Sequence, residues 1–235
     1  MSSTNRIVLA KNICHCRTCS DNLSEAKLKN TFSINEIKKS SSKNSPSIFA
    51  KLLAPKKLIC ICGKMASGKN YVCSLLEKLG WSCVDADLLV HEAINQSTEK
   101  ILAEFSDEAA RNKIIITKSD GTINRKALGQ LLFKNPALLK KQEDIVYPVI
   151  IKMIEDFISR HEKTVINATV LYKTPQLLSK CELILYVKAP FIKRFFRVKK
   201  RDKLPTSQIF RRFATQKNML SAYKKAGIQI IVINN

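Results

Sequence analysis

The sequence lacks the features that mark membrane-spanning, secreted and fibrous proteins. It has no run of the roughly 18 apolar residues that a membrane-spanning helix needs, and its first residues lack the compact apolar stretch of a secretory signal. Only 6 of its 235 residues are glycine and 45% are hydrophobic, which excludes collagen-like and disordered chains. We therefore expect a soluble, cytoplasmic protein with one complete domain and an appendage, and no membrane partner.

Acidic residues are scarce. The chain has 19 Asp and Glu against 41 Lys and Arg, a formal net charge of +22. This imbalance predicts an anionic partner, such as a phosphorylated small molecule, nucleic acid or an acidic membrane face, and does not choose among them. The surplus is uneven, because residues 188–235 carry 13 basic side chains and one acidic one, whereas residues 56–187 carry 19 and 15.

The cysteines do not form a complete zinc motif. Cys14, Cys16 and Cys19 include one Cys-x-x-Cys spacing, but no second pair follows to complete a tetrahedral site. We favour free thiols over zinc there. The other five cysteines lie in apolar stretches, where cysteine behaves as a small hydrophobic residue, and are interpreted as reduced core thiols. They are Cys60, Cys62, Cys73, Cys83 and Cys181.

Residues 1–55 differ from the rest of the chain. They are rich in Ser, Asn and Lys and have little sustained apolar periodicity, so they predict a basic, disordered N-terminal extension. The segment is compatible either with an organellar transit peptide or with an extended start of the chain. The domain proper is expected over residues 56–235.

From Lys56 onward, short apolar runs alternate with longer helical stretches. Strands that are apolar on both faces and separated by helices are typical of a parallel sheet covered on both sides, so the fold class is α/β with about five strands. The expected strands cover residues 58–62, 82–84, 164–167, 183–187 and 228–233. The expected helices cover residues 69–80, 87–95, 98–112, 125–134, 136–160, 191–202 and 206–225.

The first strand is followed by a phosphate-binding pattern. Gly63-Lys-Met-Ala-Ser-Gly-Lys-Asn70 reads G-x-x-x-x-G-K, with Asn70 where the P-loop pattern has Ser or Thr. The glycines let backbone N–H groups and the helix N-terminus surround a phosphate, while Lys69 meets the outer phosphates. The alternative is an ordinary strand-to-helix turn. The strand before and the helix after the motif favour a three-layer P-loop nucleotide-binding fold.

A second strand leads into two carboxylates, Asp85 and Asp87. Residues two apart along a strand share a face, and the end of this strand reaches the same sheet edge as the P-loop. The pair suits a base for a hydroxyl nucleophile or a helper for Mg²⁺. The alternative is a helix N-cap at Asp87 with a solvated turn.

These residues resemble the dephospho-coenzyme A kinase family over about residues 57 to 235. The matching pieces, in chain order and at the family's spacing, are the P-loop, Leu79-Gly80 with residues 84–88, residues 120–128, residues 132–136, residues 147–149, Arg197 with Arg201-Asp202, and Arg212 with Gln216. The resemblance implies a P-loop kinase fold with a helical lid over about residues 191–212.

The resemblance also implies an activity: ATP-dependent phosphorylation of the ribose 3′-hydroxyl of dephospho-CoA, the last step of coenzyme A synthesis, with ATP and Mg²⁺ as cofactors. Asp87 would be the general base, with Lys69 and Arg201 as the other catalytic groups and Asp85, Asp87 and Tyr147 on the acceptor. Phosphoryl transfer needs mainly positioning and neutralisation of charge, which these residues can supply. The implied ATP contacts are Gly63, Ala66, Ser67, Gly68, Lys69, Asn70, Tyr71 and Arg197.

Within the P-loop the chain departs from the family at three positions. Asn70 replaces the hydroxyl residue that normally ligates Mg²⁺, so it is a weak magnesium candidate. Lys64 and Ala66 stand where the family usually has Gly, and Ala66 must therefore adopt a backbone angle that glycine tolerates better.

The acceptor side also departs from the family. Tyr147 replaces a His, and Asn167-Ala-Thr-Val-Leu-Tyr-Lys173 replaces Asp-x-Pro-Leu-Leu-Phe-Glu, so two acids and a proline are gone. These changes are compatible with a slow enzyme, an altered acceptor or a catalytically impaired relative. We expect residual kinase activity because Lys69, Asp87 and Arg201 remain.

Two other functions compete with this interpretation. The first is another P-loop kinase that acts on a small molecule or nucleotide. The second is a nucleic-acid-binding protein, because basic and aromatic residues alternate near the C-terminus. We favour small phosphorylated molecules over nucleic acid and expect the aromatic rings to pack the lid. The residues concerned are Arg194, Arg197, Lys199, Lys200, Arg201, Arg211 and Arg212, with Phe191, Phe195, Phe196, Phe210 and Phe213.

Overall fold

A six-stranded sheet forms the centre of the computed structural model, which describes residues 30–40, 47–132 and 135–235. Neighbouring strands all pair in parallel, in the order β1-β6-β5-β2-β4-β3. The strands are β1 (Thr31–Ser33), β2 (Leu58–Cys62), β3 (Ser82–Asp85), β4 (Thr164–Asn167), β5 (Leu183–Lys188) and β6 (Ile230–Asn234).

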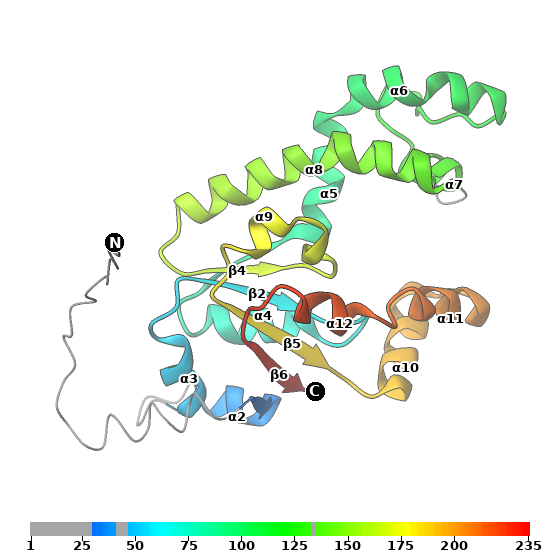
Figure 1. Cartoon of the computed structure of the whole chain (residues 1–235). Helices are drawn as coiled ribbons and strands as arrows, with labels where there is room; N and C mark the ends of the chain where they lie inside the picture. Colours follow the sequence, from blue (N-terminus) through cyan, green and yellow to red (C-terminus); the bar gives the residue numbers. More distant parts are fainter. Residues whose placement is uncertain (1–29, 41–46, 133–134) are drawn as a thin grey trace, which may run out of the picture.

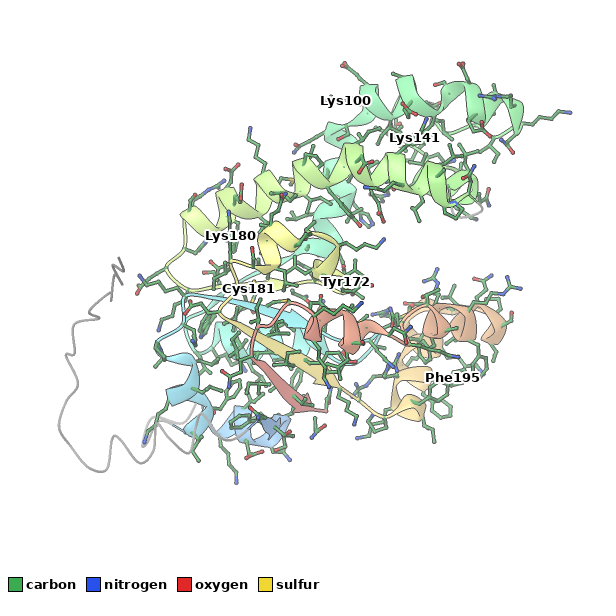
Figure 2. The ribbon with its side chains drawn as sticks, viewed as in Figure 1. Lys100, Lys141, Tyr172, Lys180, Cys181 and Phe195 are labelled. Atoms are coloured by element: carbon green, nitrogen blue, oxygen red, sulfur yellow. The ribbon has the colours of Figure 1, made fainter. Side chains whose placement is uncertain are left out.

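Helices cover both faces of this sheet, with α2 and α3 on one side and α8 and α9 on the other (Figure 1). The helices are α2 (Ile34–Lys39), α3 (Ile48–Leu53), α4 (Lys69–Glu77), α5 (Ala86–Gln96), α6 (Thr98–Arg111), α7 (Arg125–Leu132), α8 (Pro136–Ser159), α9 (Pro175–Leu178), α10 (Phe191–Asp202), α11 (Thr206–Ala214) and α12 (Met219–Lys224), with a 3₁₀ turn at Leu171–Lys173. Lys141 of α8 is labelled at the top of Figure 2. Its ammonium pairs with Glu104 of α6, which ties these two helices together.

Strand β2 shows why the sheet is buried on both sides. Successive side chains of a strand point to opposite faces. Cys60 and Cys62 belong to the core under α5 to α9, whereas Ile59 and Ile61 belong to the core under α2, α3 and α4. All four are fully buried, so an apolar run without polar alternation is what a central parallel strand requires.

All five expected strands are present, and four of them match closely. The fifth, expected over residues 228–233, forms β6 two residues later. The prediction of a single helix over residues 206–225 is wrong, because α11 ends at Ala214 and a second helix, α12, begins at Met219. The Thr215 hydroxyl donates to the Arg212 carbonyl there at 2.9 Å, a local bond that competes with continued helix.

The prediction of a disordered extension over residues 1–55 is wrong for the part of that segment that the structure describes. Residues 31–33 form β1 beside β6, with Phe32 opposite Ile233, and two helices follow. Phe32, Ile37 and Phe49 are buried in the same core as Ile59 and Ile61 of β2. Residues 1–29, with Cys14, Cys16 and Cys19, lie outside the described residues.

Two further expectations concern membranes and cysteines. Within the described ranges, no helix is long and apolar enough to span a membrane. Cys60, Cys62, Cys73 and Cys181 are free and buried, as expected of core thiols, whereas the free thiol of Cys83 is half-buried.

Candidate active site

The P-loop follows β2 at the carboxyl edge of the sheet, the edge where ligands bind in open α/β sheets. Gly63 has φ +153°, and a Cβ atom there would lie 2.4 Å from the carbonyl oxygen of Val187, so glycine is required. Ala66 has φ +59°, in the left-handed region that favours glycine. The chain therefore keeps the turn at Ala66 at some cost in backbone strain, and α4 begins directly after Gly68.

Two side chains from the C-terminal part of the chain hold the loop at Met65. Gln216 accepts the Met65 N–H at 2.7 Å, and the Arg194 Nε donates to the Met65 carbonyl at 2.8 Å. Arg194 is buried and its guanidinium lies 4.3 Å from the centre of the Phe213 ring. Burial lowers the pKa of Arg194 from its ordinary value. The break between α11 and α12 is what turns Gln216 toward the loop.

Two more side chains bind the next turn of the loop. Arg197 of α10 donates to the carbonyl of Ala66 at 3.2 Å, and the Asn235 side-chain amide donates to the carbonyl of Ser67 at 2.7 Å. The Ala66 and Ser67 carbonyl oxygens are therefore held by one side chain of α10 and one residue that follows β6.

A cavity of about 600 Å³ opens over the P-loop and the first turn of α4. Four of its side chains are cationic and, among the described residues, no Asp or Glu lines it. The lining residues are Ile34, Lys38, Ala66, Ser67, Gly68, Lys69, Asn70, Tyr71, Arg197, Arg201 and Asn235. Cations around a glycine-rich turn and a helix N-terminus form a receptor for a polyphosphate.

Lys69 is connected to the predicted base through one hydroxyl. Its ammonium lies 3.1 Å from the Thr169 Oγ1, and that hydroxyl donates to the Asp87 carboxylate at 2.6 Å. The Thr169 N–H lies 3.4 Å from the other oxygen of the same carboxylate. Thr169 stands where the resembled family has Pro, which could donate neither bond.

Asp85 and Asp87 do not share a strand face as expected. Strand β3 ends at Asp85, and Asp87 already lies in the first turn of α5. Asp85 is the N-cap of that helix, because its Oδ1 accepts the N–H groups of Asp87 and Leu88 at 3.0 and 3.3 Å. The cap is therefore Asp85 and not Asp87, which leaves the Asp87 carboxylate exposed at the site.

Asn70 contacts the neighbouring strand rather than standing alone. The Asn167 amide, at the end of β4, donates to the Asn70 Oδ1 at 3.0 Å and to the Asp85 Oδ2 at 3.1 Å. Asn167 is buried, and its Oδ1 has no hydrogen-bond partner among the described residues. The two departures from the family at positions 70 and 167 are thus in direct contact.

Tyr147 lies in a second, smaller cavity. Asp87, Tyr147 and Leu171 line this space of about 50 Å³ between α5, α8 and the segment after β4. Burial, with the nearby Glu143 carboxylate, raises the pKa of Tyr147, so the phenol stays protonated. Glu143 also pairs with Lys173, the residue that replaces the family's Glu.

Arg201 lines the large cavity from the end of α10. Its Nε and Nη2 donate to the Asp202 carboxylate at 2.6 and 3.1 Å. This bond lowers the pKa of Asp202 and raises that of Arg201. The neighbouring carboxylate therefore holds the Arg201 guanidinium at the rim of the cavity.

The lid segment, residues 191–212, forms α10 and most of α11. Its rings contact one another, and the ring centres of Phe195 of α10 and Phe210 of α11 are 5.8 Å apart. Phe195 is labelled in Figure 2. Val198, Ile209 and Phe213 form a small core that packs on Met65 and Ala66. The expectation that the aromatic residues pack the lid is confirmed for Phe213, which is buried, and for the partly buried Phe195. It is wrong for Phe191, Phe196 and Phe210, which are exposed. Arg194, grouped with the exposed basic residues, is instead buried.

The structure gathers most of the predicted residues at one edge of the sheet. Lys69, Asn70, Tyr71, Arg197 and Arg201 line one cavity, and Asp87 is joined to Lys69 through Thr169. Tyr147 lies in the separate small cavity, and Asp85 serves as a helix cap. The site residues that the sequence did not indicate are Lys38, Thr169 and Asn235. Of these, Thr169 follows a predicted strand at the ligand edge, which was a usable signal. Gln216 was part of the family resemblance and Asn167 was noted as a departure from it, but their bonds to Met65 and Asn70 were not expected.

The chain is similar to named proteins over nearly all of this domain. A family model described as dephospho-CoA kinase matches residues 57–235. A dephospho-CoA kinase of Treponema denticola is 36% identical over 184 residues, which cover 76% of this chain and 82% of the relative. A dephospho-CoA kinase of Treponema pallidum is 34% identical, over 68% of this chain and 78% of the relative.

A solved structure has the same arrangement of elements. The crystal structure of the Thermus thermophilus protein TT1252 superposes with a TM-score of 0.62 at 25% identity, covering 77% of this chain and 88% of that one. The matching family model begins at residue 57. Strand β1 and helices α2 and α3 therefore lie outside the matched part.

Proposed function

The chain belongs to the dephospho-CoA kinase family, and we propose that it carries out the family's reaction at the P-loop cavity and the adjoining Asp87. In this reaction the γ-phosphoryl group of ATP is transferred to the ribose 3′-hydroxyl of dephospho-CoA, the last step of coenzyme A synthesis. We assign this reaction to the cytoplasm.

We propose that ATP binds with its phosphates on the P-loop. Ala66, Ser67 and Gly68 of the P-loop line the cavity, and the N-terminus of α4 adds its partial positive charge. Lys69 supplies the ammonium for the outer phosphates. Arg197 fixes the loop by its bond to Ala66 and faces the same space.

Asp87 is the proposed general base toward the acceptor hydroxyl. Its carboxylate is exposed, lines the small cavity beside Tyr147, and is held by two donors from Thr169. A carboxylate within hydrogen-bond reach of a hydroxyl can accept its proton as the new P–O bond forms. Thr169 is a positioning residue, because it touches both Asp87 and Lys69.

Arg201 is proposed to neutralise charge on the transferred group. Phosphoryl transfer spreads charge over the equatorial oxygens, where a guanidinium is effective. Arg201 stands on α10 at the rim of the cavity, next to its Asp202 partner. We propose that closure of the lid segment over the two substrates brings this group inward.

The oxygen atoms present fit a Mg²⁺ ion held mainly by nucleotide phosphates and water. Within the described ranges, no cluster of three or more His, Cys, Asp or Glu could hold a metal. Mg²⁺ usually needs one or two protein oxygens beside the phosphates. The Oδ1 of Asn70, an exposed residue, and the unpartnered buried Oδ1 of Asn167 are neutral oxygens beside the P-loop that would hold the ion. The ion would neutralise charge on the phosphates.

The observation that carries the proposal is the connection of Lys69 to Asp87 through Thr169, which joins the phosphate cavity to the acceptor cavity. The test is a coupled ADP-release assay with Mg-ATP and dephospho-CoA, with AMP, dTMP and UMP as alternative acceptors. We expect turnover with dephospho-CoA alone and its loss in Lys69→Ala. Turnover with a nucleoside monophosphate instead, or none with any acceptor, would contradict the proposal.

A further inference from the structure

We infer that helix α2, outside the family-matched residues 57–235, supplies a further nucleotide contact, and that Lys38 binds the phosphate groups of ATP. This inference rests on the proposed function, because it takes the occupant of the P-loop cavity to be ATP. It assigns a binding role to a segment that the sequence pattern placed outside the domain.

Helix α2 is held firmly beside the P-loop edge. Strand β1 pairs with β6, with Ser33 opposite Asn234, so the start of α2 stands next to the end of the central sheet. A capping box between Ser33 and Glu36 fixes the first turn. Ile37 is fully buried and Phe32 packs edge-on against Phe49, at 5.1 Å between ring centres.

Two residues of this helix face the cavity. Ile34 and Lys38 are one helical turn apart and therefore lie on the same side of α2, and both line the space over the P-loop. The Lys38 ammonium lies 5.6 Å from the centre of the Tyr71 ring. Tyr71 stands in the first turn of α4, two residues after Lys69, where the helix N-terminus meets the phosphates.

Charge supports a phosphate partner for Lys38. The cavity holds the cations Lys38, Lys69, Arg197 and Arg201 and, within the described ranges, no acidic lining residue. Like charges that face one space repel one another unless an anion lies between them. A polyphosphate is the ligand that relieves this repulsion, and Lys38 would reach it from α2, whereas Arg197 and Arg201 would reach it from α10.

The neighbouring Lys39 provides a matched control. It is exposed on the same helix and has the same charge, but it borders a different groove, with Phe32, Ile48 and Phe49. A change at Lys39 therefore alters the net charge and helix propensity as a change at Lys38 does, without touching the phosphate cavity.

The experiment measures dissociation constants of adenosine, ADP and ATP by calorimetry for the full chain and for Lys38→Met, Lys38→Arg, Lys39→Met and Lys69→Ala. We expect Lys38→Met to weaken ATP binding about threefold to tenfold, as for one charged contact that is partly exposed. Binding of ADP should weaken less than binding of ATP, and binding of adenosine should not change. Lys38→Arg and Lys39→Met should bind ATP like the unchanged chain, with unchanged melting temperatures throughout the Lys38 and Lys39 variants.

Either of two results would overturn this inference and leave the proposed function intact. One is ATP binding by Lys38→Met as tight as that of the unchanged chain while Lys69→Ala is weakened. The other is an equal loss for adenosine and ATP, which would show a structural effect rather than a phosphate contact. If the unchanged chain does not bind ATP, the proposed function fails and this inference fails with it.

Discussion

The side-chain amide of Asn167 donates to the side-chain oxygen of Asn70 at 3.0 Å. In the family resemblance these positions carry an acid and a hydroxyl residue, and the sequence suggested two separate losses. The contact shows that they form one pair across β4 and α4. An aspartate at 167 would lose the amide donor to the Asn70 Oδ1 and would place its carboxylate against the Asp85 carboxylate, so the amide at 167 matches the acceptors at 70 and 85.

Asn167→Asp is expected to destabilise the protein by about 3 kcal/mol, because a buried carboxylate would replace the amide that donates to Asp85 and would face the Asp85 carboxylate. Adding Asn70→Ser should recover part of the loss, since a serine hydroxyl can donate to the new carboxylate. Urea unfolding of both single variants and the double variant measures the coupling. Strictly additive changes would show that the two positions act independently.

Asn70→Ser alone is expected to lower the Mg²⁺ concentration needed for half-maximal activity, or to raise kcat. A serine hydroxyl at the end of the P-loop is the usual protein ligand of the ion, whereas the Asn70 oxygen accepts a bond from Asn167. The measurement is a Mg²⁺ titration of turnover at fixed ATP. Identical titration curves for the variant and the unchanged chain would contradict a weakened metal contact at this position.

Asp87→Asn is expected to lower kcat by about 10² to 10⁴ with little change in the KM for ATP, as for loss of a general base. Thr169→Val should lower kcat less, because the carboxylate remains but loses its hydroxyl donor. Glu92→Gln, exposed on the same helix, is the control for a lost acidic charge. An unchanged kcat in Asp87→Asn would show that Asp87 is not the general base.

Arg201→Ala is expected to lower kcat about a hundredfold, in line with the loss of one group that stabilises developing charge. Lys200→Ala is the matched control, because Lys200 precedes it on α10, is exposed and does not line the cavity. The readout is kcat and KM for both substrates. Equal effects of the two changes would indicate general electrostatics of the lid rather than a specific role of Arg201.

The local features of the site could be predicted from the sequence, whereas its long-range contacts could not. Strand β2 and the P-loop are adjacent in the chain, and an apolar run followed by G-x-x-x-x-G-K carries its own geometry. The bond from Met65 to Gln216 joins residues 151 apart and depends on a helix break that the periodicity of residues 206–225 conceals. Asp85 took the capping role because the helix begins one residue earlier than expected.

Strand β1 was missed for a related physical reason. Three residues, Thr31 to Ser33, are too few for a visible alternation, and their stability comes from pairing with β6 at the other end of the chain. Lys38 and Lys39 of α2 are exposed. The burial of Phe32 and Ile37 is a property of the tertiary fold.

Phe32→Ala tests whether this segment belongs to the domain. The ring is 1% exposed, lies in the core of β2 and contacts Phe49, so its removal should cost about 3–5 kcal/mol of unfolding free energy. An extension that did not pack would lose nothing. Asn35→Ala, exposed on α2, is the control and should change stability by less than about 0.5 kcal/mol.

Because β1 also carries α2 to the P-loop edge, Phe32→Ala should weaken ATP binding together with stability, whereas Lys38→Met should weaken ATP binding alone. If the Phe32→Ala variant unfolds at the same urea concentration as the unchanged protein, the segment around Phe32 does not contribute to the stability of the domain, and the prediction is wrong.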